Sequence, residues 1–203
     1  MDWDSFFTLH KDLPREGPGG PDDVAWACDL AAVPADAVIC DAGSGPGGDV
    51  PALLQAAPKG RVVAVDMYFG AQADARFAGD PRVRGVEADF GALDDLPEAP
   101  FDLIWCAGAL YFLGLEEGPR AMARALKPAG VLAFSEPCRF VDTLSAKARA
   151  FFEDYPLRSA AEIGSTACCT TSCGLDGTIT GSSLCFPPRP FSLFPPRWNQ
   201  DHD

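Results

Sequence analysis

The stretch Val38-Ile-Cys-Asp-Ala-Gly-Ser-Gly-Pro-Gly47 decides the fold. It carries the end of a short apolar run, residues 37–40, directly into a glycine-rich turn. Glycine permits tight turns and lets a ligand approach the backbone closely. We therefore predict a buried strand, then a turn that binds a ligand, then a helix over residues 50–57.

Four more apolar segments follow, at intervals typical of strands that alternate with helices. They cover residues 61–66, 83–88, 101–106 and 131–135. A helix is expected over residues 116–126, ended by Lys127-Pro-Ala-Gly130. Strands that are apolar on both faces and alternate with helices indicate an α/β fold with a mostly parallel, buried sheet.

The 203 residues divide into three predicted zones. Residues 1–35 hold a Gly/Pro-rich loop and a helix for which Asp22 or Asp23 is the expected N-cap. Residues 36–164 hold the alternating segments. Residues 165–203 differ sharply, because the first 164 residues contain 30 alanines and this tail contains one. Cysteine, serine, threonine and proline dominate the tail, which favours a linker, a tail or a different coding origin.

Charge and cysteine usage exclude several classes of function. Asp and Glu total 29 against 16 Lys and Arg, so a net charge of −13 disfavours nucleic acid and anionic membranes as partners. The eight cysteines lack paired zinc spacing and there are only two histidines, so no metal site is expected. The longest charge-free stretch around the middle of the chain, residues 103–115, is too short to span a bilayer. An acidic start without a signal peptide predicts a reducing, cytoplasmic location.

Acidic side chains follow the first three predicted strands and indicate what the glycine turn binds. Asp41 precedes the turn, Asp66 ends the second strand, and Asp89-Phe90 ends the third. A carboxylate at Asp66 suits both ribose hydroxyls, whereas Asp89 and Phe90 suit the amine and the ring face of an adenine. An acid beside the turn suits a sulfonium and an ammonium and disfavours a diphosphate. This set describes adenosine with a cationic amino-acid arm.

The chain resembles the class I S-adenosylmethionine-dependent methyltransferases. The resemblance rests on five stretches in the family's order, which are Val38–Gly47, Val63-Ala-Val-Asp66, Glu87-Ala-Asp-Phe90, Phe101-Asp-Leu-Ile-Trp105 and Leu126-Lys-Pro-Ala-Gly-Val-Leu132. It implies a Rossmann-like three-layer α/β/α sandwich. Phe6-Phe7, His10, the loop Leu13-Pro-Arg-Glu-Gly-Pro-Gly19 and Tyr155-Pro156 extend it to a subgroup of small methyltransferases, in which this loop lies beside the cofactor pocket.

The resemblance also implies residue roles around S-adenosylmethionine. Asp41, Gly43 and Gly45 would line the methionine arm, and Cys106 would flank the sulfonium. Asp66 would bind the ribose, with Met67 against the adenine. The full expected cofactor set is Arg15, Asp41, Gly43, Ser44, Gly45, Asp66, Met67, Asp89, Phe90 and Cys106.

Two departures from the subgroup qualify these implications. Ala107 stands where the subgroup usually has an acid after the strand-four tryptophan. Beyond residue 164 the family pattern dissolves, except for a weak strand expected over residues 178–186. The tail therefore reads as a shifted reading frame or an unrelated extension, and the last two strands of the usual seven-stranded sheet are in doubt.

Methyl transfer from a sulfonium is an in-line displacement that needs a base only when the nucleophile carries a proton of high pKa. Candidates for catalysis are His10, Tyr111 and Glu136, with Arg15 as an anion clamp. The Asn-Pro-Pro-aromatic signature of nucleobase or glutamine methylation is absent after residue 106. Together with the negative charge, this favours a small-molecule acceptor.

Two other functions remain open at this stage. The turn also satisfies the G-x-G-x-x-G pattern of an NAD(P)-dependent reductase, although a Tyr-x-x-x-Lys pair and a substrate domain are missing. The tail and Ala107 are compatible with a relative that binds the cofactor and is catalytically impaired. Apolar residues of the tail, including Phe186 and Trp198, are compatible with a homodimer.

Overall fold

The computed structural model describes residues 13–17, 19–67, 77–139, 143–153, 157–159, 161–163 and 181–184. The first half of the fold contains α2 (Pro21–Leu30), β1 (Val38–Ala42), α3 (Val50–Ala56), β2 (Arg61–Asp66), β3 (Val83–Glu87) and η1 (Phe90–Asp95). The second half contains β4 (Phe101–Ala107), η2 (Leu110–Phe112), α5 (Glu117–Arg124), β5 (Leu126–Ser135), β6 (Cys138–Arg139), α6 (Ala146–Phe151), β7 (Arg158–Ser159) and β8 (Gly181–Leu184).

Six strands form one sheet in the order β3-β2-β1-β4-β5-β8, and every neighbouring pair is parallel. The order runs one way from β1 to β3 and the other way from β4 onward. Ligands of open parallel sheets bind at the carboxyl ends of the strands, where the order reverses. This topology therefore places the expected site at the ends of β1 and β4.

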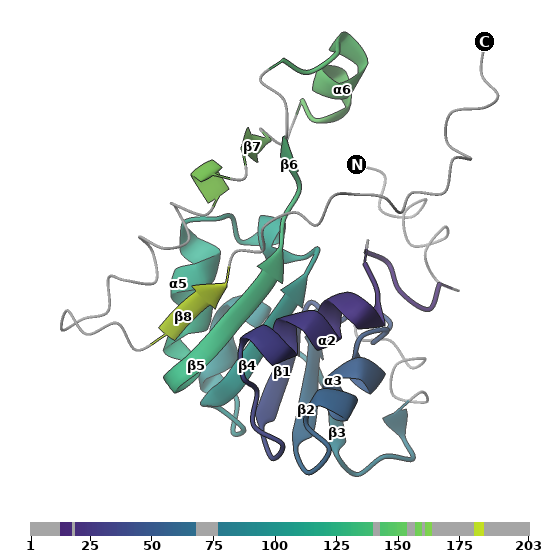
Figure 1. The fold of residues 1–203 in the computed structure, drawn as a ribbon, viewed down its shortest axis with the longest axis vertical. Coiled ribbons are helices and arrows are strands. Elements are labelled where there is room, and N and C mark those ends of the chain that lie inside the picture. Colours follow the sequence, from purple (N-terminus) through teal and green to yellow (C-terminus); the bar gives the residue numbers. More distant parts are fainter. Residues whose placement is uncertain are drawn as a thin grey trace.

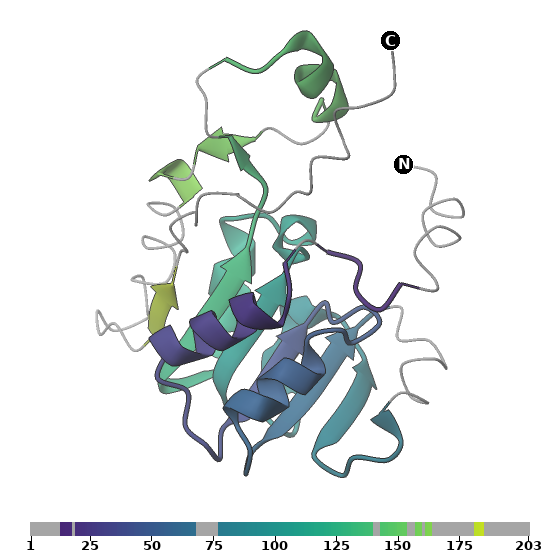
Figure 2. The same ribbon diagram turned by 45° about the vertical axis from the view of Figure 1, so that its right-hand side comes forward.

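Two separate hydrophobic cores lie on the two faces of the sheet. Helices α2 and α3 cover one face, and α5 and η1 cover the other (Figures 1 and 2). Alternate residues of β1, β2, β4 and β5 pack into alternate cores, as in a sheet buried on both sides. In β4, for example, Leu103 and Trp105 pack beneath the helix pair, whereas Ile104 and Cys106 face the opposite core. The α/β fold with a parallel sheet between helical layers confirms the sequence prediction.

The ends of two elements differ from the sequence prediction. The N-cap of α2 is Gly20, not Asp22 or Asp23. Asp23 instead accepts a 2.8 Å hydrogen bond from the N–H of Gly20, and Pro21 occupies the first turn, where proline is favoured. Strand β5 begins at Leu126, five residues earlier than predicted, because Leu126 already pairs with Phe101.

The register between β4 and β5 slips between Phe101 and Leu103, whose partners are Leu126 and Val131. The residues between these partners include Ala129, which adopts a left-handed φ of 65°. The Lys-Pro-Ala-Gly stretch predicted to end the helix is therefore an irregular first part of the strand. Helix α5 itself ends at Arg124.

The predicted tail contributes one described strand to the sheet. Residues 181–184 form β8, which pairs in parallel with Gly130 to Ala133 of β5. This pairing confirms the weak strand expected there and supplies a sixth strand. The remaining tail residues lie outside the described part of the chain, as do Phe6-Phe7, His10 and Tyr155-Pro156. The boundaries of the three zones stay a prediction.

Cysteines 28, 40, 106 and 138 are all free thiols, and the first three are buried. Within the described residues, no group of three or more His, Cys, Asp or Glu side chains is arranged to hold a metal ion. None of the helices in the described ranges has the length and apolarity needed to cross a membrane.

Candidate functional site

The glycine turn joins β1 to α3 and bends toward the end of β2. The N–H groups of Gly43 and Ser44 donate hydrogen bonds of 2.8 and 3.1 Å to the carbonyl of Val65. Gly43 has a left-handed φ of 71°, and a Cβ built there would lie 2.3 Å from the Cβ of Ala109. Any other residue at Gly43 would therefore be strained and would collide with the segment after β4.

Asp41 is a buried carboxylate directly before this turn. Its side chain is 2% exposed, and its Oδ2 atom has no hydrogen-bond partner. Burial raises the pKa of Asp41 well above its usual range, the negative charges of Asp49 and Asp66 raise it further, and Arg15 lowers it. The hydroxyl oxygen of Ser44 is also buried without a partner. Asp41 Oδ2 and Ser44 Oγ, both beside the glycine turn, can therefore form hydrogen bonds with a ligand.

Asp66 ends β2 as predicted and lies against the same turn. Its Oδ2 accepts a 2.9 Å hydrogen bond from the N–H of Gly45. Its carbonyl accepts a 3.2 Å hydrogen bond from Ala88, which connects it to the end of β3. The following residue, Met67, is 52% exposed. An exposed apolar side chain next to a carboxylate fits the predicted adenosine contact, which stays a prediction.

Asp89 and Phe90 lie at the start of η1. Asp89 is its N-cap and accepts a 2.7 Å hydrogen bond from the N–H of Gly91 through Oδ1. Phe90 is 6% exposed and packs into the core that it shares with Leu93 and Leu110. The ring of Phe90 therefore packs in the core beside the site. The predicted contact between this ring and the face of an adenine stays a prediction.

A short N-terminal segment crosses the glycine turn. We call residues 13–17 the strap. Arg15 of the strap forms a two-pronged ion pair with Asp49, with Nε to Oδ1 at 2.8 Å and Nη2 to Oδ2 at 2.9 Å. Its Nη1 also donates to the carbonyl of Gly17. A Cβ at Gly48 would lie 2.5 Å from the carbonyl oxygen of Pro14, so the strap lies directly against the turn.

Asp49 is the central residue of this attachment, and sequence reasoning missed it. It is 7% exposed and also accepts a 2.8 Å hydrogen bond from the indole nitrogen of Trp105. An Asp between Gly-Gly and a helix start would ordinarily cap the helix, yet Asp49 makes no such cap. The sequence does show an arginine, an aspartate and a tryptophan in three separate motifs, but nothing in it indicates that Arg15, Asp49 and Trp105 contact one another. Arg15, which was expected to bind the cofactor or an anion, thus holds the strap against Asp49.

A second polar group lies beyond the ends of β4 and β5. Cys106 is fully buried, and burial is the main cause that raises the pKa of its thiol. The negative charges of Asp41 and Glu136 raise this pKa further. Burial also raises the pKa of Tyr111, and the charges of Glu136 and Glu16 contribute. The structure thus brings two of the predicted catalytic residues, Tyr111 and Glu136, together, while His10 lies outside the described residues.

Glu16 brings a further carboxylate from the strap to this edge of the sheet. A Cβ built at Gly45 would lie 3.0 Å from Oε2 of Glu16, so this carboxylate stands over the glycine turn. We call Glu16, Asp41, Asp66 and Glu136 the acidic edge. An edge of this charge favours a positively charged ligand. Ala107, where an acid was expected by resemblance, contributes only backbone here, since its carbonyl faces Gly17.

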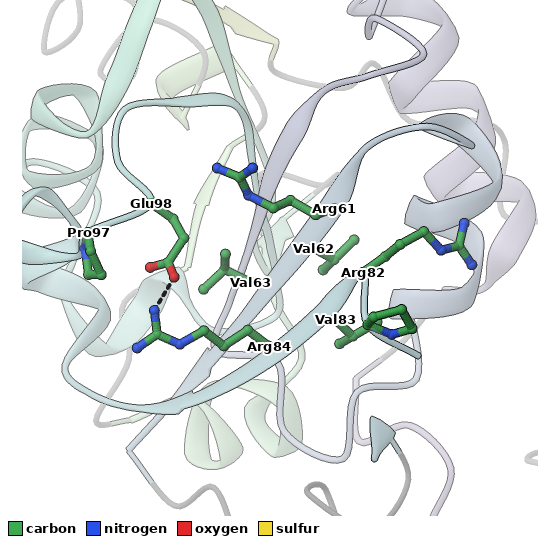
Figure 3. Close-up of a pocket in the computed structure, with 9 residues that line it drawn as sticks. Arg61, Val62, Val63, Arg82, Val83, Arg84, Pro97 and Glu98 are labelled. Atoms are coloured by element: carbon green, nitrogen blue, oxygen red, sulfur yellow. Dashed lines mark hydrogen bonds and ion pairs between the residues drawn. The ribbon is translucent and has the colours of Figure 1, made fainter. Parts of the chain in front are cut away.

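A cavity of about 340 Å³ lies at the opposite ends of the strands. It is lined by the starts of β2 and β3, and Glu98 and Pro97 close one side (Figure 3). Arg84 pairs with Glu98 across it, and Arg82 pairs with Asp80 at 2.6 Å. The charges of Arg82 and Arg84 are therefore neutralised within the protein. The cavity is therefore separate from the acidic edge, where the unpartnered polar atoms of Asp41, Ser44 and Glu136 gather.

Comparison with known proteins agrees with this geometry. Residues 39–130 match the family described as a methyltransferase domain. A trans-aconitate 2-methyltransferase of Azoarcus sp. (strain BH72) is 37% identical over 115 residues, which are 53% of this chain and 43% of that protein. The chain therefore spans less than half the length of this curated relative.

Solved structures show the same fold. An S-adenosylmethionine-dependent methyltransferase from Geobacter sulfurreducens, in complex with S-adenosyl-L-homocysteine, is 19% identical with a TM-score of 0.63, over 78% of this chain and 66% of that chain. A second such complex from Thiobacillus denitrificans is 22% identical with a TM-score of 0.62, over 79% and 67%. Residues 39–130 therefore match a methyltransferase domain, and the chain shares its fold with these S-adenosylmethionine-dependent methyltransferases.

Proposed function

We propose that this chain transfers a methyl group from S-adenosylmethionine to a small-molecule acceptor. The observation that carries the proposal is the pair of buried, unpartnered atoms, Asp41 Oδ2 and Ser44 Oγ, beside the glycine turn. Buried polar groups in folded proteins are nearly always hydrogen-bonded, so such a pair indicates a ligand. The two related structures named above hold S-adenosyl-L-homocysteine, the product of the same cofactor.

The residues present fit this cofactor. Gly43 and Gly45 let Ala109 and Glu16 approach the turn closely, and Asp41 and Ser44 would bind the amino-acid arm. Asp66 would bind the ribose, and Met67, Asp89 and Phe90 would border the adenine. When bound there, S-adenosylmethionine supplies an electrophilic methyl group. The acidic edge matches the positive charge that this cofactor carries on sulfur and nitrogen.

The chain's own contribution is positioning. Placing the acceptor atom in line with the methyl group and excluding water supplies roughly 7–11 kcal/mol of the barrier. The strap is held against the glycine turn by the Arg15–Asp49 ion pair, where it would exclude water. Tyr111 and Glu136 are the proposed acceptor-side residues, and either would orient the acceptor or accept its proton. His10 is the third candidate.

Calorimetric titration tests the proposal. S-adenosyl-L-homocysteine should bind the wild-type protein with one site, and Asp41→Asn should weaken it at least tenfold. Asp36→Asn removes the same charge from an exposed turn and should leave binding unchanged. Failure of both S-adenosylmethionine and S-adenosyl-L-homocysteine to bind at millimolar concentration would overturn the proposal.

A panel of acceptors then separates an active enzyme from an impaired relative. The panel should include trans-aconitate, because the curated relative is named for it, together with amines, phenols and neutral amides. Release of S-adenosyl-L-homocysteine with any of them shows turnover. Tight cofactor binding without turnover across the panel would favour the catalytically impaired alternative. We also propose a reducing, cytoplasmic location, which the four free thiols support.

A further inference from the structure

Glu136 follows β5 at the same edge of the sheet as the glycine turn. The pairing of Ala107 with Ser135 places Glu136 level with Gly108, directly after β4. Phe134 and Leu132, two and four residues earlier, lie in the same core as Cys106. Because residues two apart in a strand share a face, Glu136 continues this face beyond the end of the sheet.

Both carboxyl oxygens of Glu136 are buried and have no hydrogen-bond partner among the described residues. Such a group is costly in a folded protein unless a ligand or a counter-charge satisfies it. Burial raises the pKa of Glu136 to about 7, and no cation among the described residues opposes the shift. The carboxylate is therefore held at the edge of the site without a positive partner among the described residues.

The titratable groups that the described residues place around Glu136 do not supply a positive charge. Its negative charge raises the pKa of the thiols of Cys106 and Cys138 and of the Tyr111 phenol. These three groups are neutral when protonated, and Glu16 is a further acid near Tyr111. Arg139, three residues further along the chain, pairs with Glu162 at 3.3 Å. The described surroundings thus repel an anionic acceptor and suit a cationic one.

We propose that Glu136 binds a protonated nitrogen of the methyl acceptor, so that the site selects amines over carboxylates. This inference rests on the proposed function, because it names the chemical class of the molecule that receives the methyl group. An ammonium group donates to both carboxylate oxygens at once, and hydrogen bonds between charged partners are the strong ones. Glu136 is then a specificity residue of the acceptor site.

The ionisation of Glu136 gives this binding a pH dependence. An alkylammonium stays protonated well above neutrality, whereas Glu136 loses its proton near its raised pKa of about 7. The affinity for an ammonium probe should therefore rise between pH 6 and pH 8 and level off above it. A neutral residue at this position would show no such rise.

The test uses n-butylammonium and n-butyrate, which match in size and differ in charge. Each is titrated into isotope-labelled protein saturated with S-adenosyl-L-homocysteine, and the amide signals of Gly108 and Glu136 are followed. Butylammonium should cause saturable shifts, and butyrate should bind at least tenfold more weakly. Glu136→Gln should weaken butylammonium at least tenfold, whereas Glu153→Gln, an exposed carboxyl of the same size, should not.

Several results would overturn the inference. Absence of a saturable shift with butylammonium, equal binding of butyrate, or unchanged binding in Glu136→Gln each contradicts it. Glu136→Asp guards against misfolding of the glutamine variant, since it keeps the charge and should keep part of the affinity. If S-adenosyl-L-homocysteine itself fails to bind, the proposed function fails, and the same titration on ligand-free protein still decides whether Glu136 binds ammonium.

Discussion

The indole nitrogen of Trp105 donates a 2.8 Å hydrogen bond to Oδ2 of Asp49. The same carboxylate accepts two hydrogen bonds from Arg15 of the strap. One buried acid therefore connects β4, the start of α3 and a segment that is 34 residues away from it in sequence. Because Asp49 is nearly inaccessible to water, each of its partners offsets the cost of burying its charge.

Trp105→Phe should lower the free energy of unfolding by about 2 kcal/mol, because it removes a buried hydrogen bond to a charged acceptor. Urea denaturation measures this. Arg120→Ala is the control, since its ion pair with Glu117 is long, at 3.6 Å, and exposed; it should change stability by less than about 0.5 kcal/mol. Equal effects of the two substitutions would contradict a stabilising role for the indole.

Gly48→Ala should displace the strap. The added methyl group would lie 2.5 Å from the carbonyl oxygen of Pro14 and 2.9 Å from the Cβ of Arg15. We expect at least tenfold weaker binding of S-adenosyl-L-homocysteine by calorimetry. Gly79→Ala is the matched control, because a Cβ there has nothing within 4 Å. Unaltered binding in Gly48→Ala would show that the strap does not cover the cofactor.

Asp41→Asn should change how stability depends on pH. The folded-state pKa of Asp41 is raised, so between the unfolded value near 4 and the folded value the native protein binds the extra proton. Wild-type stability should therefore fall as pH rises through that window, and the variant should lose this part of the fall. Melting temperatures at pH 5 and pH 8 test this. A fall of equal size in the variant would contradict it.

Glu136→Gln should make the thiol of Cys138 more reactive. Burial and the negative charge of Glu136 both raise the pKa of this half-buried thiol. Removing the charge lowers the pKa, so more thiolate is present and alkylation by iodoacetamide at pH 8 should be faster. Peptide mapping by mass spectrometry gives the rate at Cys138, with the fully buried Cys40 as the internal control that stays unmodified. A slower or equal rate at Cys138 would contradict the charge effect.

Strand periodicity and the glycine turn were enough to predict the sheet and the placement of Asp41 and Asp66. These depend on local pattern and on the rule that the carboxyl ends of parallel strands share one edge. The two-pronged contact of Arg15 with Asp49 could not be predicted from the sequence, because it joins two loops that come together only through tertiary packing. Phe90 shows the same limit, since its burial beside Leu93 follows from the turn of η1.

The acidic edge has a consequence for the balance between cofactor and product. S-adenosylmethionine carries a positive sulfonium that S-adenosyl-L-homocysteine lacks, so the field of Glu16, Asp41 and Asp66 attracts the first more strongly. Dissolved ions weaken such attraction when part of the edge faces solvent. We expect the preference for unreacted cofactor over spent cofactor to shrink as ionic strength rises, so product inhibition should be strongest in concentrated salt.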